Sequence, residues 1–222
     1  MRLVITGLVL LCMAGIAGAS IGTVTASNDG FFTDGYINIA GARNVTGYGG
    51  IYYLNKTAGT GDGALLPNGR INSFCIDLFQ DSAGGSAPYD VWMPEFAPIP
   101  GVAMGTDRAN KLRELWGNYF LIAAADPQKA EAFSACVWEI VFETDTVLTV
   151  SSGTGFSCSD LATGMPDLAN GWLASLNGSG PLANLRAITS ETYQDYLVEV
   201  PEPATLSLLA LGGLAMLRRR KK

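Results

Sequence analysis

The 222-residue chain contains no histidine, and this absence narrows the chemistry that it can perform. Without imidazole there is no Ser-His-Asp triad, no Cys-His pair and no histidine general base, so other side chains would have to carry any reaction. Basic residues are also few, 14 against 20 acidic ones, and the pI is near 4.6. No stripe of positive charge is available to neutralise phosphates, so nucleic acid is not expected as a partner.

Cysteine is rare as well. Cys12 belongs to the N-terminal segment described next, which leaves Cys75, Cys136 and Cys158. An odd number leaves at least one thiol without a partner in the same chain, so one disulfide and one free cysteine are expected if the chain is exported. A Cys136–Cys158 bond would close the shortest loop, but the sequence does not choose the pair. Three isolated cysteines without a CxxC motif or histidine do not suit zinc, and neither a metal nor a cofactor is expected.

The N-terminus has the features of a signal peptide. Arg2 is followed by an apolar run over residues 3–16 and by Ala17-Gly18-Ala19, the small-x-small pattern that signal peptidase cleaves, here before Ser20. The apolar run is short for a membrane anchor, and polar residues rather than a positive flank follow it. We therefore expect residues 1–19 to be removed by signal peptidase and the rest to be exported.

The C-terminus has a second apolar segment, residues 204–217, which carries no charge. As a helix it would be about 21 Å long, a marginal membrane span. Five positive residues follow it directly and would keep the C-terminus on the cytoplasmic side, so that the residues before the segment face outward. They are Arg218, Arg219, Arg220, Lys221 and Lys222. The pattern predicts a short transmembrane helix that holds the exported domain at the membrane.

Residues 200–222 resemble the PEP-CTERM sorting signal of bacterial exported proteins. The resemblance rests on the triplet Pro201-Glu202-Pro203, the short glycine-containing apolar segment and the basic end, all in order. It implies that an exosortase-type protease recognises the triplet, cuts near it and sorts the protein to the envelope or the extracellular matrix. The triplet would then be a substrate and not a catalytic group. Its two prolines also prevent helix continuation and present an extended segment outside the membrane.

The exported part, residues 20–199, is expected to be an α+β domain: a β-sandwich or barrel-like sheet with a helical insertion. Turn signals separate short apolar runs that predict strands at 21–25, 36–39, 51–54, 74–79, 89–92, 147–150, 183–188 and 196–200. Helical spacing predicts helices at 108–124, after a Thr106-Asp107 cap, from Pro127 after an Asp126 cap, and at 166–176.

Two blocks of this domain resemble bacterial thioester domains: Phe74-Cys75-Ile76-Asp77-Leu78, and residues 132–140 ending in Trp138-Glu139-Ile140. In that family a cysteine of the first block and a glutamine of the second, four residues before the tryptophan, form an internal thioester with which surface adhesins bond to amines. Cys75 matches the cysteine. Ser134 stands where the glutamine is expected, and Gln80 and Gln128 lie outside the block. The resemblance thus implies a thioester-like scaffold without the bond.

No complete catalytic motif lies between the terminal signals, so we predict a non-enzymatic surface or matrix protein that binds or assembles outside the cell. A covalent adhesin using Cys75 is one alternative. A carboxylate-based hydrolase using Asp77, Glu139 or Glu143 is another, since paired carboxylates serve glycosidases. The aromatic and proline-rich stretch at 89–100, with Trp92, could stack on sugars, so extracellular polysaccharide is a candidate partner.

Overall fold

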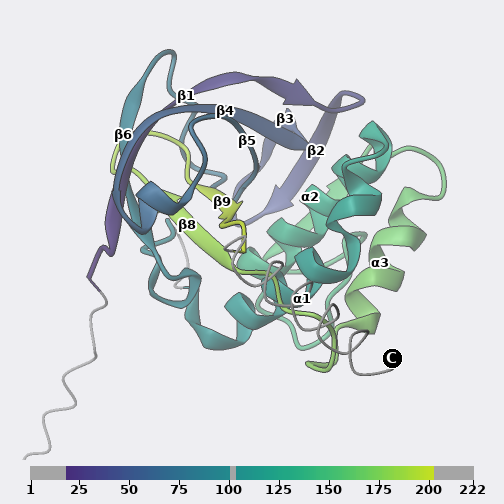
Figure 1. Cartoon of the computed structure of the whole chain (residues 1–222). Coiled ribbons are helices and arrows are strands. Elements are labelled where there is room, and N and C mark those ends of the chain that lie inside the picture. Colours follow the sequence, from purple (N-terminus) through teal and green to yellow (C-terminus); the bar gives the residue numbers. More distant parts are fainter. Residues whose placement is uncertain (1–18, 101–103, 203–222) are drawn as a thin grey trace, which may run out of the picture.

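The computed structural model describes residues 19–100 and 104–202, and a closed six-stranded barrel dominates it (Figure 1). Every neighbouring pair of barrel strands is antiparallel. Closure leaves no free edge, so of the two predicted sheet arrangements the barrel is the one found. In pairing order the strands are β1 (Gly22–Phe32), β4 (Ile51–Gly61), β5 (Gly69–Cys75), β9 (Tyr196–Glu199), β8 (Leu185–Thr189) and β6 (Ala87–Trp92).

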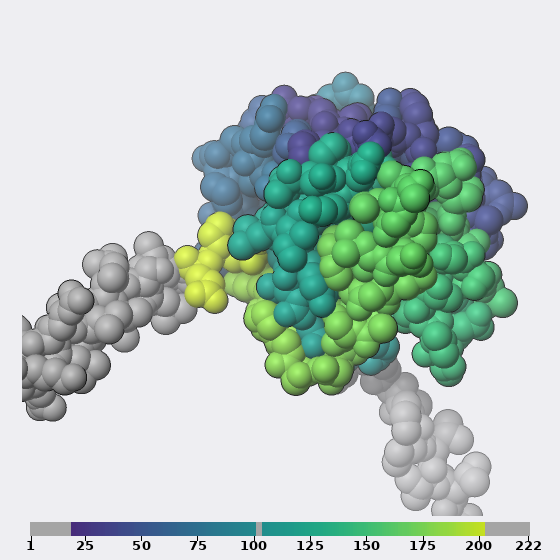
Figure 2. Space-filling view, turned by 90° about the vertical axis from the view of Figure 1, so that its right-hand side faces the viewer, coloured from purple at the N-terminus to yellow at the C-terminus, as the bar shows by residue number. Residues whose placement is uncertain are grey.

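The helices lie together on one side of the barrel, where they cover the face that Figure 2 shows in teal and green. The chain leaves the barrel after β6 and returns with β8, which pairs with β6, so the predicted helical insertion is confirmed. The inserted helices are α1 (Gly105–Ala123), α2 (Pro127–Phe142) and α3 (Met165–Ser175). The remaining elements are a small sheet of β3 (Val45–Tyr48), β2 (Tyr36–Gly41) and β7 (Phe156–Ser159), and the 3-10 helices η1 (Asp62–Leu65) and η2 (Pro94–Phe96).

Helix α2 is the centre of the core. All of its residues from 130 to 142 are buried, between α1 and α3 on one side and strands of both sheets on the other. The ring of Phe133 lies 4.5 Å from that of Phe74 on β5 and 6.0 Å from that of Trp116 on α1. This burial explains why the helix is apolar nearly all round rather than along one stripe.

The three predicted helices agree with α1, α2 and α3 within a few residues. The Thr106-Asp107 cap is wrong, because α1 begins at Gly105 and no side chain caps it. The Asp126 cap is confirmed: its Oδ1 accepts hydrogen bonds from the N–H groups of Gln128 and Lys129 at 2.9 and 3.1 Å.

Asp126→Ala is therefore expected to lower the free energy of unfolding by about 1 kcal/mol, because two backbone donors lose their acceptor. Urea denaturation followed by tryptophan fluorescence measures the difference. Asp107→Ala, in the uncapped first turn of α1, is the control. If Asp126→Ala lowers the free energy of unfolding by no more than Asp107→Ala does, Asp126 does not act as a stabilising cap of α2.

The predicted strand at 147–150 is wrong. The N–H groups of Thr149 and Val150 donate to the side chains of Glu139 (2.6 Å) and Asn170 (2.9 Å) rather than to another strand. Of the two valines at 147–150, Val150 is fully buried while Val147 is 72% exposed, so the apolar run does not mark one buried strand face. The strand predicted at 74–79 ends at Cys75, and the four-residue strands β3 and β7 were not predicted.

Several predictions for the termini lie outside the described residues: the signal peptide up to residue 18 with Ala17, Pro203, the apolar segment at 204–217 and the basic residues at 218–222. Ala19, Pro201 and Glu202 are described and exposed. Within the ranges 19–100 and 104–202, no helix has the length and apolar character to cross a membrane.

Candidate functional site

The pairing of β5 with β9 brings two distant segments together at one end of the barrel. Cys75, the last residue of β5, lies opposite Tyr196, the first of β9. Beyond the strands the pairing continues, with the Ile76 N–H donating to the Asp195 carbonyl at 3.0 Å and the Gln194 N–H to the Asp81 carbonyl at 3.0 Å. The side chain of Gln194 is thereby held beside Cys75, although the two residues are 119 positions apart.

The Cys75 sulfur and the Gln194 carboxamide are in contact. Gln194 Nε2 donates to Cys75 Sγ at 2.9 Å, and Sγ in turn donates to the Asp77 carbonyl at 2.8 Å. Nε2 is bonded to the carbonyl carbon Cδ, so the sulfur lies next to the one carbon of this side chain that a thiol can attack. The arrangement has the two groups needed for an internal thioester.

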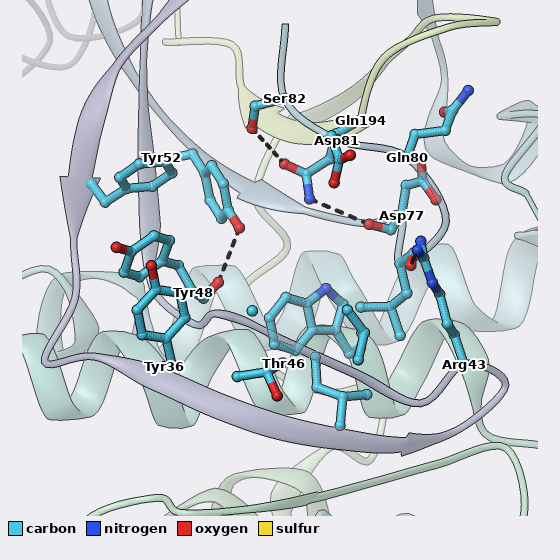
Figure 3. Close-up of a pocket in the computed structure, with 16 residues that line it drawn as sticks. Tyr36, Arg43, Thr46, Tyr48, Tyr52, Asp77, Gln80, Asp81, Ser82 and Gln194 are labelled. Carbon is cyan, nitrogen blue, oxygen red and sulfur yellow. Dashed lines mark hydrogen bonds between the residues drawn. The ribbon is translucent and has the colours of Figure 1, made fainter. Parts of the chain in front are cut away.

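The carbonyl oxygen of the same carboxamide is held on its other side. Ser82 Oγ donates to Gln194 Oε1 at 2.9 Å, and Ser82 Oγ also lies 2.9 Å from the hydroxyl of Tyr196. Figure 3 shows the Gln194 side chain between Ser82 and Asp77. Both ends of the carboxamide are fixed, so its carbon is presented to the sulfur in one orientation.

A pocket of about 220 Å³ reaches the Gln194 side of this pair, and its lining includes Gln194, Ser82, Asp77 and Trp138. On its other side are aromatic residues of β1, β2, β3 and β4, three of which are labelled in Figure 3. Their rings stack closely, Phe31 on Tyr48 at 4.8 Å and Tyr48 on Tyr36 at 4.0 Å, and Phe31 meets Tyr52 edge-on at 4.9 Å. The pocket therefore leads to the Gln194 carboxamide past a wall of aromatic side chains.

The sulfur is a protonated thiol at neutral pH. Burial raises the pKa of Cys75 far above its ordinary value, and the nearby indole of Trp138 only partly offsets this. Burial also raises the pKa of Asp77, and it raises that of Asp195 to about 8 with a contribution from Asp77. Cys75 and Asp77 both contact the Gln194 side chain, and groups with shifted pKa values clustered in this way are typical of functional sites.

Ser134, where the resemblance placed a glutamine, does not lie at this site. Its hydroxyl donates to the Gly50 carbonyl at 3.2 Å. The resemblance implies a scaffold without the bond because Ser134 replaces the glutamine of that block, and the structure places a glutamine from elsewhere in the chain, Gln194, in contact with Cys75. The sequence analysis did not consider Gln194. Listing every glutamine of the exported domain would have included it, but nothing local to it marks its role.

The other two cysteines lie elsewhere. Cys136 is buried on α2, with its sulfur 3.4 Å from the Ala169 carbonyl, and Cys158 lies on β7. All three cysteines are free in the structure, so the expected disulfide is not present. The sulfur of Cys75 makes no contact with another cysteine, because it is hydrogen-bonded to the side chain of Gln194 and to the carbonyl of Asp77.

The three carboxylates proposed for a hydrolase, those of Asp77, Glu139 and Glu143, accept hydrogen bonds from backbone N–H groups. Glu139 and Glu143, both buried on or just after α2, accept hydrogen bonds from backbone N–H groups of the following loop, residues 144–156. Asp77 accepts from the N–H of Phe79 at 2.6 Å, and its second oxygen is buried without a partner in the described part of the chain.

The aromatic stretch at 89–100 does not form a stacking surface. Tyr89 points into the barrel, where it packs against Tyr196 and is buried, and Trp92 is half-buried. Phe96 is exposed but stands apart from them on η2. Among the described residues, the exposed side chains of Phe31 and Tyr36 line the pocket beside Gln194.

The family model of the PEP-CTERM protein-sorting motif matches residues 199–221. No curated protein and no solved structure was found to be similar to this chain. The match begins at the last residue of β9, and Pro201 and Glu202 follow the buried Val200 directly, so the sorting motif starts where the barrel ends. The resemblance at residues 200–222 is thus confirmed: the chain carries a PEP-CTERM sorting motif, which indicates a protein that exosortase sorts to the cell exterior.

Proposed function

We propose that the exported domain is a covalent adhesin, in which Cys75 and Gln194 form an internal thioester that captures primary amines outside the cell. The contact of 2.9 Å between Gln194 Nε2 and Cys75 Sγ, in a buried site that a pocket opens to, is the observation that carries the proposal. It also supplies the acyl partner that the resemblance to thioester domains lacked.

Thioester formation needs only atoms already at the site. The Cys75 sulfur attacks Gln194 Cδ, the C–N bond to Nε2 breaks, and a C–S bond replaces it. The thiol proton ends on the departing nitrogen, which leaves as ammonia. Because Sγ and Nε2 are only 2.9 Å apart, the proton has a short distance to travel once the S–H bond turns from the Asp77 carbonyl to the nitrogen.

Capture of a target reverses the bonding. A neutral primary amine entering by the pocket attacks Gln194 Cδ, the C–S bond breaks, and one amine proton passes to the sulfur. The products are an N-substituted Gln194 amide and a free Cys75 thiol. The new bond joins the target to Gln194 itself, so the protein is consumed in the attachment that it makes and acts as an attachment device and not as an enzyme.

The remaining features suit a protein that works at the surface. The exported domain is acidic, with 8 basic residues against 20 acidic ones between Ser20 and Pro203, which favours solubility and limits adhesion to anionic surfaces. We place its partners among amine-bearing molecules of the envelope or extracellular matrix, including polysaccharide. Signal peptidase would act after Ala19, and the membrane segment would hold the chain until exosortase cuts near residues 201–203.

The test is the intact mass of the purified protein, measured without thiol reagents, before and after incubation with methylamine. We expect a mass one ammonia below the calculated value. Methylamine should add one methylamine to that mass and expose one new thiol. A phosphine reductant separates this from a disulfide, because it restores two hydrogens to a disulfide and does not open a thioester.

A chain of the calculated mass that methylamine leaves unchanged would overturn the proposal. The domain would then be a binding or structural protein that acts without a covalent bond. A deficit of two hydrogens that the phosphine reverses would point to a disulfide instead.

A further inference from the structure

Two hydroxyl groups, those of Ser82 and Tyr196, lie on the carbonyl side of Gln194, and the proposed function does not explain them. Gln194 Oε1 has no hydrogen to give, so Ser82 is the donor in their 2.9 Å hydrogen bond. A serine hydroxyl has one proton. Ser82 therefore accepts in its 2.9 Å contact with Tyr196, and the tyrosine hydroxyl is the donor there.

The direction of this chain is fixed by the environment of Tyr196. Burial raises the pKa of its phenol well above the ordinary value, and the hydrogen bond with Ser82 only partly offsets this. The phenol consequently keeps its proton and remains a donor. Asn28 adds a weaker contact, with Nδ2 3.5 Å from Ser82 Oγ.

We propose that Ser82 is a catalytic residue of the thioester chemistry: its hydroxyl stabilises the negative charge that develops on Gln194 Oε1, and Tyr196 positions and polarises it. The inference rests on the proposed function above. It adds a named donor for the oxyanion, which neither the sorting motif nor the Cys75–Gln194 contact supplies.

The chemistry requires such a donor in both directions. When the sulfur attacks Cδ, the C=O bond opens to a tetrahedral intermediate with its charge on Oε1, and the C–N bond then breaks as the charge returns. When an amine attacks the thioester, the same oxygen is charged again before the C–S bond breaks. A donor already in place at 2.9 Å needs no reorganisation in either step.

The position of Ser82 explains why it can serve both steps. It lies in the segment after β5 that pairs with the Gln194 loop, and both residues line the pocket. The Ser82 hydroxyl thus contacts the oxygen of the carboxamide while the Cys75 sulfur contacts its nitrogen, and Figure 3 shows Ser82 and Asp77 on opposite sides of the Gln194 side chain.

Ser82→Ala tests the proposal, with Ser82→Thr as the conservative variant and Ser134→Ala as the matched control. Ser134 also donates to a carbonyl oxygen, that of Gly50, but not to a reacting one. Removing one oxyanion donor typically costs a factor of about 100 to 1,000. We expect Ser82→Ala to slow ammonia loss and methylamine opening by such a factor, Ser82→Thr to restore most of each rate, and Ser134→Ala to change neither.

Two further readouts separate catalysis from structural support. Tyr196→Phe keeps Ser82 but removes its donor, and we expect both rates to fall by about tenfold. In thioester that has formed, the carbonyl stretch of ¹³C-labelled glutamine should move to higher frequency in Ser82→Ala, because the oxygen has lost its hydrogen bond.

Failure of this inference differs from failure of the proposed function. Folded Ser82→Ala protein that forms and opens its thioester at the wild-type rates would overturn the role of Ser82 and leave the thioester in place. Wild-type protein without an ammonia deficit would overturn both. If Ser82→Ala forms no thioester while Ser82→Thr does, the role of Ser82 is supported.

Discussion

Gln194→Ala is expected to abolish both the ammonia deficit and the methylamine adduct, leaving a chain of the calculated mass. Alanine has no acyl group, so the Cys75 sulfur has nothing to attack. Cys75→Ala should give the same result from the other side of the bond. Because each change removes one of the two bonded atoms, the expected loss is complete rather than partial, and intact mass after methylamine incubation measures it.

Gln80→Ala is the matched control. Gln80 also lines the pocket, but its Nε2 donates to the Glu191 carbonyl at 2.8 Å and makes no contact with the sulfur among those described. This variant should keep the deficit and the adduct. Labelling that survives in Gln194→Ala, or that disappears in Gln80→Ala, would assign the acyl group to the wrong glutamine.

Local patterns in the sequence predicted much of the fold. Asp126 and Pro127 mark the start of α2 in the sequence and in the structure, because a cap depends on neighbours within three residues. The resemblance also singled out Cys75, and the structure places it in contact with a carboxamide. The predicted strand at 147–150 failed because two polar side chains, Glu139 and Asn170, take up its backbone donors.

The partner of Cys75 was not predictable in the same way. Gln194 reaches the sulfur only because β5 pairs with β9 in one register, and a shift of one residue would turn its side chain to the other face. That register is fixed by barrel closure over the whole domain. Ser134, by contrast, lies in a block that looks right locally but occupies a face of α2 directed at Gly50.

The largest expected change in stability comes from Glu143→Gln. The Glu143 carboxylate accepts hydrogen bonds from the N–H groups of Thr144 (2.6 Å), Asp145 (2.8 Å), Gly155 (3.1 Å) and Phe156 (3.1 Å), and so ties both ends of the loop to α2. An amide has one acceptor oxygen and turns its NH₂ group toward donors. We expect the free energy of unfolding to fall by about 2–4 kcal/mol at pH 7, measured by urea denaturation.

The effect should depend on pH in a defined window. Burial alone would raise the pKa of Glu143, but the four backbone donors outweigh it and lower the pKa to about 2. A carboxyl with a lowered folded-state pKa contributes stability above its unfolded value, near 4.5, and loses it as the pH falls toward 2. The difference between wild type and Glu143→Gln should therefore shrink over that range. A difference that stays constant would show that the carboxylate charge is not its cause.

Glu139→Gln is the internal control, four residues earlier on the same helix. Burial raises the pKa of Glu139 to about 8, so at pH 7 the group is mostly a neutral acid, and its Oε2 has no partner within the described ranges. Replacing it with a neutral amide should change stability little below about pH 4.5, where the folded and the unfolded wild type both hold the proton. At pH 7 the variant should be the more stable of the two, because unfolding of the wild type releases a proton there and unfolding of the variant does not. The folded state binds this proton more tightly than the unfolded one, so between about pH 4.5 and 8 wild-type stability falls as the pH rises. In Glu139→Gln the free energy of unfolding should fall less steeply over this pH range. The fall that remains is due to Asp195, whose pKa is also raised to about 8. Two glutamates one helical turn apart thus hold the same loop in opposite charge states, and their glutamine variants should have opposite pH dependences.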